Sequence, residues 1–212
     1  MPSIRSYFFA KFYDATMKDV EEACLSTWRA DLLAKTTGDV LEIGAGTGVN
    51  ISYYPASIRR LVLSEPDPNM RKILAQRLEA SSLEQAAVVD SGAEAIDFPA
   101  ASFDCVVSTL VLCSVKDPSA SLQEIYRLLR PGGTLFFIEH VTAKDNPRIA
   151  RWQKVITPLW KFMCGGCHLT RDTAEAIRQT GFQTDQLERV TVQNAPAVIQ
   201  PGIRGMAIKP VD

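Results

Sequence analysis

Three features of this 212-residue sequence predict a mostly parallel α/β sheet. Residues 39–48 read DVLEIGAGTG, an apolar segment typical of a buried parallel strand, followed by a turn containing three glycines. Four further apolar segments alternate with helical patterns up to residue 141, as in strands joined by crossover helices. Two final strands, expected at 182–192 and 203–209, are separated by a loop containing two prolines. We therefore expect helices on both faces of the sheet and an antiparallel hairpin at its edge.

Length and composition indicate one ordinary globular domain spanning residues 1–212. The hydrophobic fraction is 46% and the charged fraction 22%. The net charge of -1 offers no clustered basic face, so a nucleic-acid partner is not expected. No apolar run approaches the ~18 residues that cross a bilayer, and the N-terminus lacks the apolar core of a signal peptide. We expect a cytoplasmic protein without an integral membrane segment, and a homodimer is a candidate assembly.

The remaining segments of the sequence predict further helices and strands. Residues 1–38 carry aromatic and apolar side chains near helical spacing and predict two amphipathic helices, which either cover one end of the sheet or form a lid over a ligand crevice. A helix is expected from Thr170, its N-cap, to residue 180, after a bend at the two glycines 165–166. Other expected helices span 49–54, 70–79 and 119–129, and other expected strands span 60–64, 86–90 and 134–141. The apolar run 105–115 contains a further strand, whose end is expected at 108–112.

Two carboxylates near the glycine turn indicate the kind of ligand. Glu42 precedes the turn, where it would repel a pyrophosphate and attract a cationic group. Val49 stands where a dinucleotide fingerprint has its third glycine, which disfavours NAD. Glu65 follows the second strand at the spacing of an acid that binds ribose hydroxyls, while Asp67 is placed to cap the next helix. The pattern therefore favours a nucleoside without phosphates.

These residues together resemble the class I S-adenosylmethionine (SAM) dependent methyltransferases. The resemblance covers residues 38–141 and is carried by the EIGAGTG turn, the EPDPNM segment after strand two, the SGAEAIDFP loop, Ser-Phe-Asp at 102–104 and Arg-Pro-Gly-Gly at 130–133. Within this class, the core is similar to the type 11 and ubiquinone/menaquinone methyltransferases. It implies a Rossmann-like, seven-stranded sheet with SAM as cofactor, and an N-terminal helical cap at 1–38, a core at 38–141 and an acceptor-side cap with the last strands at 142–212.

The resemblance also implies which residues hold SAM. They are Glu42, Gly44, Ala45, Gly46, Gly48, Asn50, Glu65, Pro66, Met70, Gly92, Ala93, Glu94, Thr109 and Leu110. The sequence departs from the commonest pattern at Gly92, where an Asp is usual. The adenine amino group would then meet Glu94 or a backbone carbonyl.

The acceptor side contains one predicted catalytic residue and one ambiguous motif. His140 follows the fifth strand and is expected to take a proton from the acceptor. The CGGCH segment at 164–168 has haem, redox and half-zinc patterns, but the absence of a signal peptide argues against haem attachment, and two histidines are a thin supply for zinc, so no metal is expected. The five cysteines are expected to be reduced thiols.

The acceptor itself is suggested by a second resemblance. TLVLCSVK at 109–116, Glu-His-Val at 139–141 and the aromatic segment leading into GCHLTR are similar to the alkyl-thiol methyltransferases of the methyltransferase-like group. Those proteins carry an N-terminal membrane segment that this sequence does not show. A thiol needs only a weak base, since its pKa is near 8.5. We expect a small, fairly apolar acceptor, with a thiol as one candidate. A quinone-type C- or O-methyltransferase and a SAM-binding module without catalysis are the alternatives.

Overall fold

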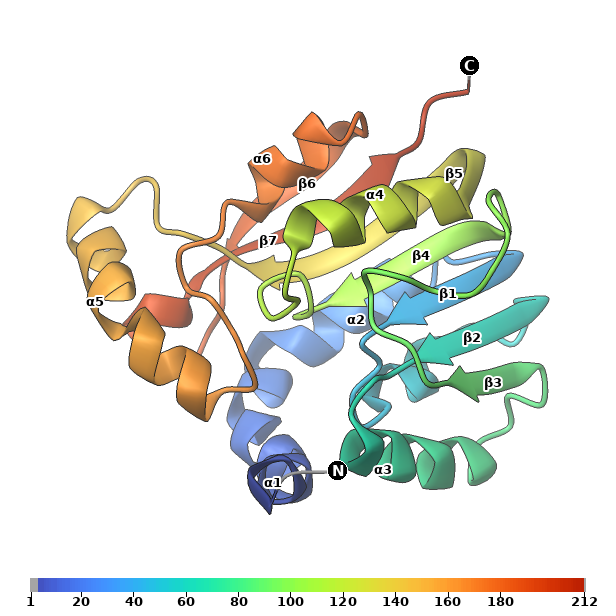
Figure 1. The fold of residues 1–212 in the computed structure, drawn as a ribbon, viewed down its shortest axis with the longest axis horizontal. Coiled ribbons are helices and arrows are strands. Elements are labelled where there is room, and N and C mark those ends of the chain that lie inside the picture. Colours follow the sequence, from blue (N-terminus) through green and yellow to red (C-terminus); the bar gives the residue numbers. More distant parts are fainter. Residues whose placement is uncertain (1–3, 212) are drawn as a thin grey trace.

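A single seven-stranded sheet organises the computed structural model, which describes residues 4–211 (Figure 1). The strand order is β3-β2-β1-β4-β5-β7-β6, with β7 antiparallel to both of its neighbours and the other pairs parallel. The strands are β1 Asp39–Ile43, β2 Arg60–Ser64, β3 Ala86–Val89, β4 Phe103–Thr109, β5 Leu129–His140, β6 Gln183–Thr191 and β7 Pro201–Ile208. The predicted fold class, with its antiparallel C-terminal hairpin, is confirmed.

Helices cover both faces of this sheet, as Figure 1 shows. One face packs against α1 (Ile4–Val20), a π-helical turn η1 (Glu21–Leu25), α2 (Ser26–Leu33) and α3 (Pro68–Glu79). The other packs against α4 (Pro118–Leu128) and α6 (Thr173–Gln179). Two short 3₁₀ helices, η2 (Val49–Tyr53) and η3 (Ala197–Ile199), complete the set with α5 (Pro147–Met163), which lies beyond the carboxyl ends of the parallel strands.

Two apolar cores result from the alternation of side chains along the strands. In β1, Val40 points into the core under α1–α3, and its neighbour Leu41 points into the core under α4 and α6. Both side chains are completely buried. A parallel sheet covered on both faces needs such continuous apolar strands, which explains why the sequence reads as unbroken hydrophobic runs.

The structure corrects several expected boundaries. Residues 49–53 form a 3₁₀ helix rather than an α-helix. The two N-terminal helices are joined through η1 without a break. Asp172, not Thr170, caps α6, by accepting a hydrogen bond from the amide of Glu175. Just before this helix, Arg171 donates to two backbone carbonyls outside it, and the helix begins at Thr173.

The fourth strand is shorter than its apolar run suggests. The apolar run continues to residue 115, but the strand ends at Thr109, within the expected range 108–112, and Leu110 adopts a left-handed backbone with φ of 58°. Beyond it, the amides of Val111 and Leu112 donate to the carboxylate of Glu139 instead of to a neighbouring strand. A buried acid therefore replaces the ladder where an apolar run alone predicts more strand.

None of the helices within residues 4–211 combines the length and hydropathy needed to cross a membrane.

Candidate active site

The glycine turn after β1 is formed by left-handed backbone that other residues rarely adopt. Gly44 and Gly46 have φ of 55° and 57°. A Cβ at Gly44 would lie 2.8 Å from both methyl groups of Val111, whereas one at Gly46 would meet no atom closer than 3.9 Å. Gly44 therefore lets the loop after β4 approach, and Gly46 leaves its backbone open to a ligand. This open cradle is what a nucleoside bound at the turn requires.

Glu65 joins the two predicted cofactor motifs. It is 6% exposed, and its Oε2 accepts a hydrogen bond of 2.8 Å from the amide of Gly46, while its Oε1 accepts one of 2.8 Å from the amide of Asp67. Burial raises the pKa of the Glu65 carboxyl. Asp67 in turn caps α3 by accepting from the amides of Asn69 and Met70, as expected. The acid at the end of β2 thus lies directly against the glycine turn.

Glu42 lies behind the turn, in a buried polar network. Its two oxygens accept from the amide group of Asn50 at 2.8 Å and from the hydroxyl of Tyr54 at 2.7 Å. Asn50 accepts in turn from the guanidinium of Arg29 at 2.7 Å. Burial raises the pKa of Glu42 to about 7. The predicted methionine-end acid is therefore already engaged within the protein, and Arg29 and Tyr54 are partners that the motif did not reveal.

The ends of β4 and the following loops complete the cofactor side. Thr109 accepts from the Asn50 amide group at 3.1 Å, so it belongs to the same network. Ala93 is buried, and Glu94 accepts from the backbone amides of Lys116 and Asp117. Glu94 therefore fixes the loop 91–99 to the start of α4, a contact that the expected adenine role did not include.

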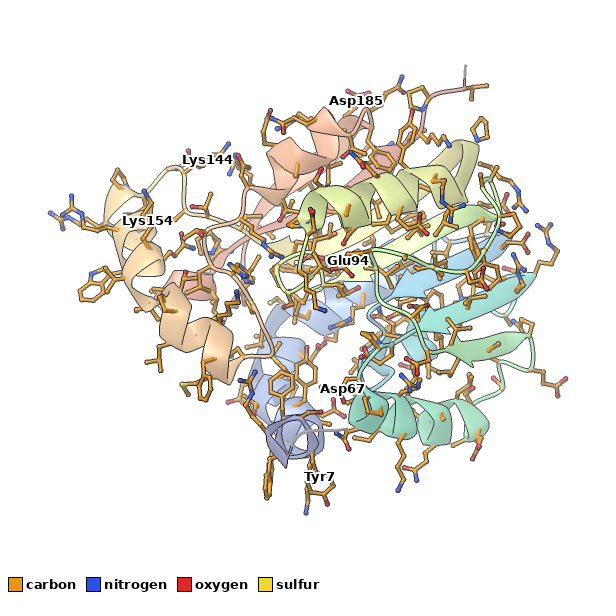
Figure 2. All side chains as sticks on the ribbon, viewed as in Figure 1. Tyr7, Asp67, Glu94, Lys144, Lys154 and Asp185 are labelled. Atoms are coloured by element: carbon orange, nitrogen blue, oxygen red, sulfur yellow. The ribbon has the colours of Figure 1, made fainter. Side chains whose placement is uncertain are left out.

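The N-terminal helix α1 lies against this side of the molecule. Asp14 accepts hydrogen bonds from Thr47 of the glycine turn at 2.7 Å and from Arg77 of α3 at 2.6 Å. Ser6 donates to Asp67, the residue that Figure 2 labels between α1 and α3. Helix α1 is thereby tied to both motifs that flank the Glu65–Gly46 contact.

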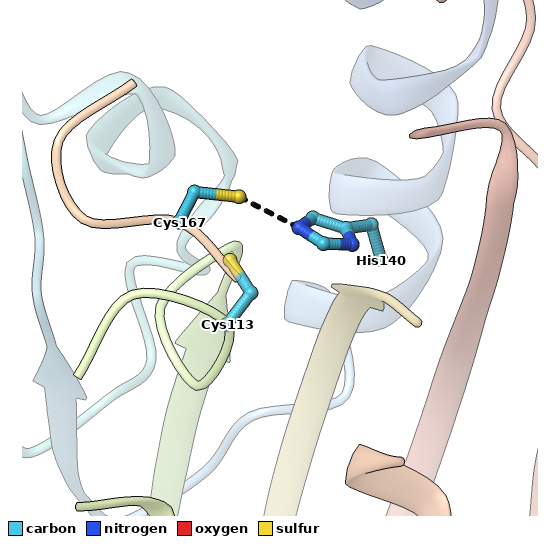
Figure 3. Close-up of side chains that lie close together, drawn as sticks. All are labelled: Cys113, His140 and Cys167. Atoms are coloured by element: carbon cyan, nitrogen blue, oxygen red, sulfur yellow. Dashed lines mark hydrogen bonds between the residues drawn. The ribbon is translucent and has the colours of Figure 1, made fainter. Parts of the chain in front are cut away.

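The acceptor side gathers three buried side chains from separate segments. His140 ends β5, Cys113 follows β4, and Cys167 lies in the loop after α5 (Figure 3). His140 Nε2 lies 2.7 Å from Cys167 Sγ, and one potential ligand atom from each residue lies within 4.8 Å of the others. Burial alone would lower the pKa of His140, but the neighbouring Cys113 outweighs it and raises that pKa. The position of His140 at the end of β5 was expected, whereas the presence of two cysteines beside it was not.

Two charged residues hold the backbone of this cluster. Glu139, 1% exposed, accepts from the Ser108 hydroxyl at 2.8 Å and from the amides of residues 111 and 112 at 3.0 Å. Arg171 donates to the carbonyls of Leu112 and Val115, both at 2.6 Å. The turn that carries Cys113 is therefore fixed from two sides, by Glu139 and Arg171, which lie in the EHV and GCHLTR segments but were not predicted to have this role.

Comparison with known proteins agrees with this geometry. Residues 41–137 match the family described as "Methyltransferase domain". The fold resembles those of the [4+2]-cyclase SpnF (TM-score 0.70, 19% identity, covering 89% of this chain and 80% of that one) and of the YcgJ protein from Bacillus subtilis (TM-score 0.70, 15% identity, 89% and 99%). These likenesses show that the fold is Rossmann-like.

Curated relatives refine the assignment. The chain is 39% identical over 172 residues to the thiol S-methyltransferase TMT1B of Rattus norvegicus and 37% identical over 172 residues to TMT1A of Homo sapiens, in both cases covering 80% of this chain and 70% of the relative. A ubiquinone/menaquinone C-methyltransferase UbiE of Marinomonas sp. (strain MWYL1) is 34% identical over 104 residues, covering 47% of this chain and 41% of that one. The chain belongs to the family of SAM-dependent methyltransferases that includes TMT1A and TMT1B.

Proposed function

We propose that this enzyme transfers a methyl group from SAM to the sulfur of a small, fairly apolar thiol. The named activity of relatives that align over most of the chain supports the thiol. The match to UbiE supports quinone chemistry less, because it covers only 47% of the chain. A sulfonium donor carries its own leaving group, so the protein's task is to align the acceptor sulfur with the methyl carbon, about 3 to 3.5 Å away.

The observation that carries the cofactor site is the contact between Glu65 and Gly46. The Glu65 carboxylate has lone pairs left beyond the two amide bonds, and we assign them to the ribose hydroxyls. Gly44, Ala45, Gly46, Gly48 and Asn50 would cradle the methionine end, with Glu42 supporting them from behind. Pro66, Met70, Gly92, Ala93 and Glu94 would surround the adenosine, and Thr109 and Leu110 the reacting centre.

The N-terminal helix is assigned the role of a lid. Its bonds to Thr47 and Asp67 lie on both sides of the Glu65–Gly46 contact, so closure of α1 would exclude water from a bound nucleoside. The same helix carries exposed aromatic side chains, as does the facing helix α5: Tyr7, Phe8, Phe12, Trp152 and Phe162. An entrance lined by such apolar side chains would suit an apolar acceptor. The cytoplasmic location and the homodimer stay predictions.

His140 is the predicted acceptor of the thiol proton. This residue is 6% exposed, lies at the end of β5 beside the turn after β4, and is the one histidine in the cluster. In this fold the ends of these two strands are where the donor methyl and the acceptor are expected to meet.

Isothermal titration with SAM and S-adenosylhomocysteine tests the cofactor site. The wild-type protein should bind both, and Glu65→Ala should weaken binding at least ~100-fold, because it removes two ribose hydrogen bonds to a charged acceptor and frees the Gly46 amide. Glu84→Ala, outside the site, is the matched control. Unchanged affinity in Glu65→Ala would refute the assignment.

Turnover of labelled SAM with a panel of thiols, phenols and quinols then identifies the acceptor. Binding without any turnover would indicate a module that does not catalyse.

A further inference from the structure

The cluster of Cys113, His140 and Cys167 has the composition of a transition-metal site. Two sulfurs and one imidazole nitrogen converge from three segments of the chain, and all three side chains are buried (Figure 3). Catalytic zinc sites in proteins use three such ligands and keep a fourth position open, and two cysteines with one histidine are a known set. The cysteine pair differs from the one that the CGGCH motif suggests, because Cys113 replaces Cys164.

The spacing of these atoms suits a metal ion. Zinc–sulfur and zinc–nitrogen bonds of about 2.3 and 2.0 Å place tetrahedral ligand atoms about 3.5 Å apart. The three ligand atoms lie within 4.8 Å of one another, and His140 Nε2 and Cys167 Sγ lie 2.7 Å apart, so sub-ångström to ångström adjustments would complete the geometry. The other ring nitrogen, Nδ1, is buried and lacks a hydrogen-bond partner among residues 4–211. The contact that orients the imidazole is therefore the one from Nε2, which points toward the sulfurs.

The backbone around the ligands is held rigidly enough to keep such a site in shape. Glu139 and Arg171 fix the turn of Cys113 from two sides. The loop that carries Cys167 is joined to the same turn, because the amide of His168 donates to the carbonyl of Cys113 at 2.8 Å. Its bend needs glycine, since Gly165 has φ of 61° and a Cβ there would lie 3.0 Å from the Phe9 ring. A metal centre needs a backbone fixed in this way, because the ligand atoms have to be held close to their bonding geometry.

We propose that Cys113, His140 and Cys167 bind one divalent transition-metal ion, zinc being the best match, and that its fourth position receives the acceptor thiol. Two thiolates and a neutral imidazole balance a doubly charged ion, so before the acceptor binds the site carries no net charge and is compatible with burial. This role for the metal rests on the proposed thiol methylation, whereas the metal site itself does not.

The chemistry of the step follows from the charge of the ion. A thiol that coordinates a metal ion loses its proton, here to water, and is held as a thiolate. Its lone pair then forms the bond to the methyl carbon as the bond from that carbon to the sulfonium sulfur breaks. The neutral thioether product is a weaker ligand than the thiolate and leaves the metal. With the metal bound, His140 is a ligand and the proton passes to water, whereas in the metal-free site His140 itself would accept the proton. The effect of chelation on thiol methylation distinguishes these two roles of His140.

Cobalt(II) titration of the reduced, chelator-treated protein tests the site. We expect one ion per chain, with the visible absorption of tetrahedral cobalt and a sulfur-to-cobalt charge-transfer band. Cys167→Ser and Cys113→Ser should weaken cobalt binding at least ~100-fold, while Cys164→Ser should bind as the wild type, because Cys164 belongs to the same motif and lies outside the cluster. SAM titration of each variant checks that it is folded. Absence of stoichiometric binding, or equal loss in Cys164→Ser, would overturn the proposal.

Adding a small apolar thiol to the cobalt protein tests the fourth position. The visible band should shift, and chelation should lower thiol methylation at least ~100-fold with SAM affinity unchanged. Full activity after chelation would overturn the activating role and leave the methyltransferase function standing. Failure to bind SAM would refute the proposed function without touching the cobalt result. Formation of a Cys113–Cys167 disulfide in place of metal binding would identify a redox pair and refute the metal site.

Discussion

The cofactor side and the acceptor side of the site are built from contacts of different kinds. At the cofactor side, Glu65 meets Gly46 across two neighbouring parallel strands, 19 residues apart in the chain. At the acceptor side, Cys113, His140 and Cys167 come from two strand ends and a loop. Glu139, beside His140, and Arg171, after Cys167, bind the turn of Cys113 from these other segments. The first arrangement follows from one βαβ unit. The second exists only when β4, β5 and the loop after α5 have come together.

Substituting Gly44 should have the largest effect and should show that the cofactor side depends on close backbone approach. In Gly44→Ala the left-handed backbone and the contact with Val111 should together cost about 4 kcal/mol. Gly46→Ala shares the backbone penalty but meets open space, and should cost about 1 to 2 kcal/mol. Urea denaturation measures both. Equal losses would show that the approach of Val111 does not matter, and Val111→Ala should partly rescue Gly44→Ala.

The buried acid Glu42 should give the cofactor side a measurable pH dependence. Its folded pKa of about 7 lies above the unfolded value, so the folded state binds more protons between about pH 4.5 and 7. Stability should therefore be higher at low pH and fall across this window by up to about 3 kcal/mol. The stability difference between wild type and Glu42→Gln, followed by urea denaturation from pH 4.5 to 8, isolates the slope. A difference that does not vary with pH would contradict the assignment.

Removing Arg171 should destabilise the acceptor side without changing SAM binding at the cofactor side. Arg171→Met loses two hydrogen bonds to the carbonyls of Leu112 and Val115 and should cost about 2 kcal/mol. SAM affinity should change less than about threefold, because none of these bonds reaches the glycine turn. Arg178→Met, whose partner Glu175 is at the surface, should stay within about 0.5 kcal/mol. A large loss of SAM affinity in Arg171→Met would show that the two sides are coupled.

Much of the fold and of the cofactor side could be predicted from the sequence. The reason is that residues at the ends of neighbouring parallel strands lie close together, so their spacing in the chain indicates which of them meet. Glu65 was placed from its distance to Gly44, and Asp67 caps α3 as expected. Glu42 was assigned to the methionine end from its place before the turn, yet its oxygens bind Asn50 and Tyr54. The motif gave the position of the acid along the chain but could not show what its side chain contacts.

The amino-acid sequence by itself determined the order of the strands in the chain, the glycines at left-handed positions and the acid that faces them. These depend on backbone geometry and on side-chain periodicity, which act over a few residues. Only the tertiary structure brought Cys113 and Cys167 to His140. The cluster contains Cys113 and not Cys164, although Cys164 is closer to Cys167 in the sequence. The physical reason is that sulfur and imidazole contacts across separate elements are set by how the strand ends and the loop pack, and no local spacing encodes that packing.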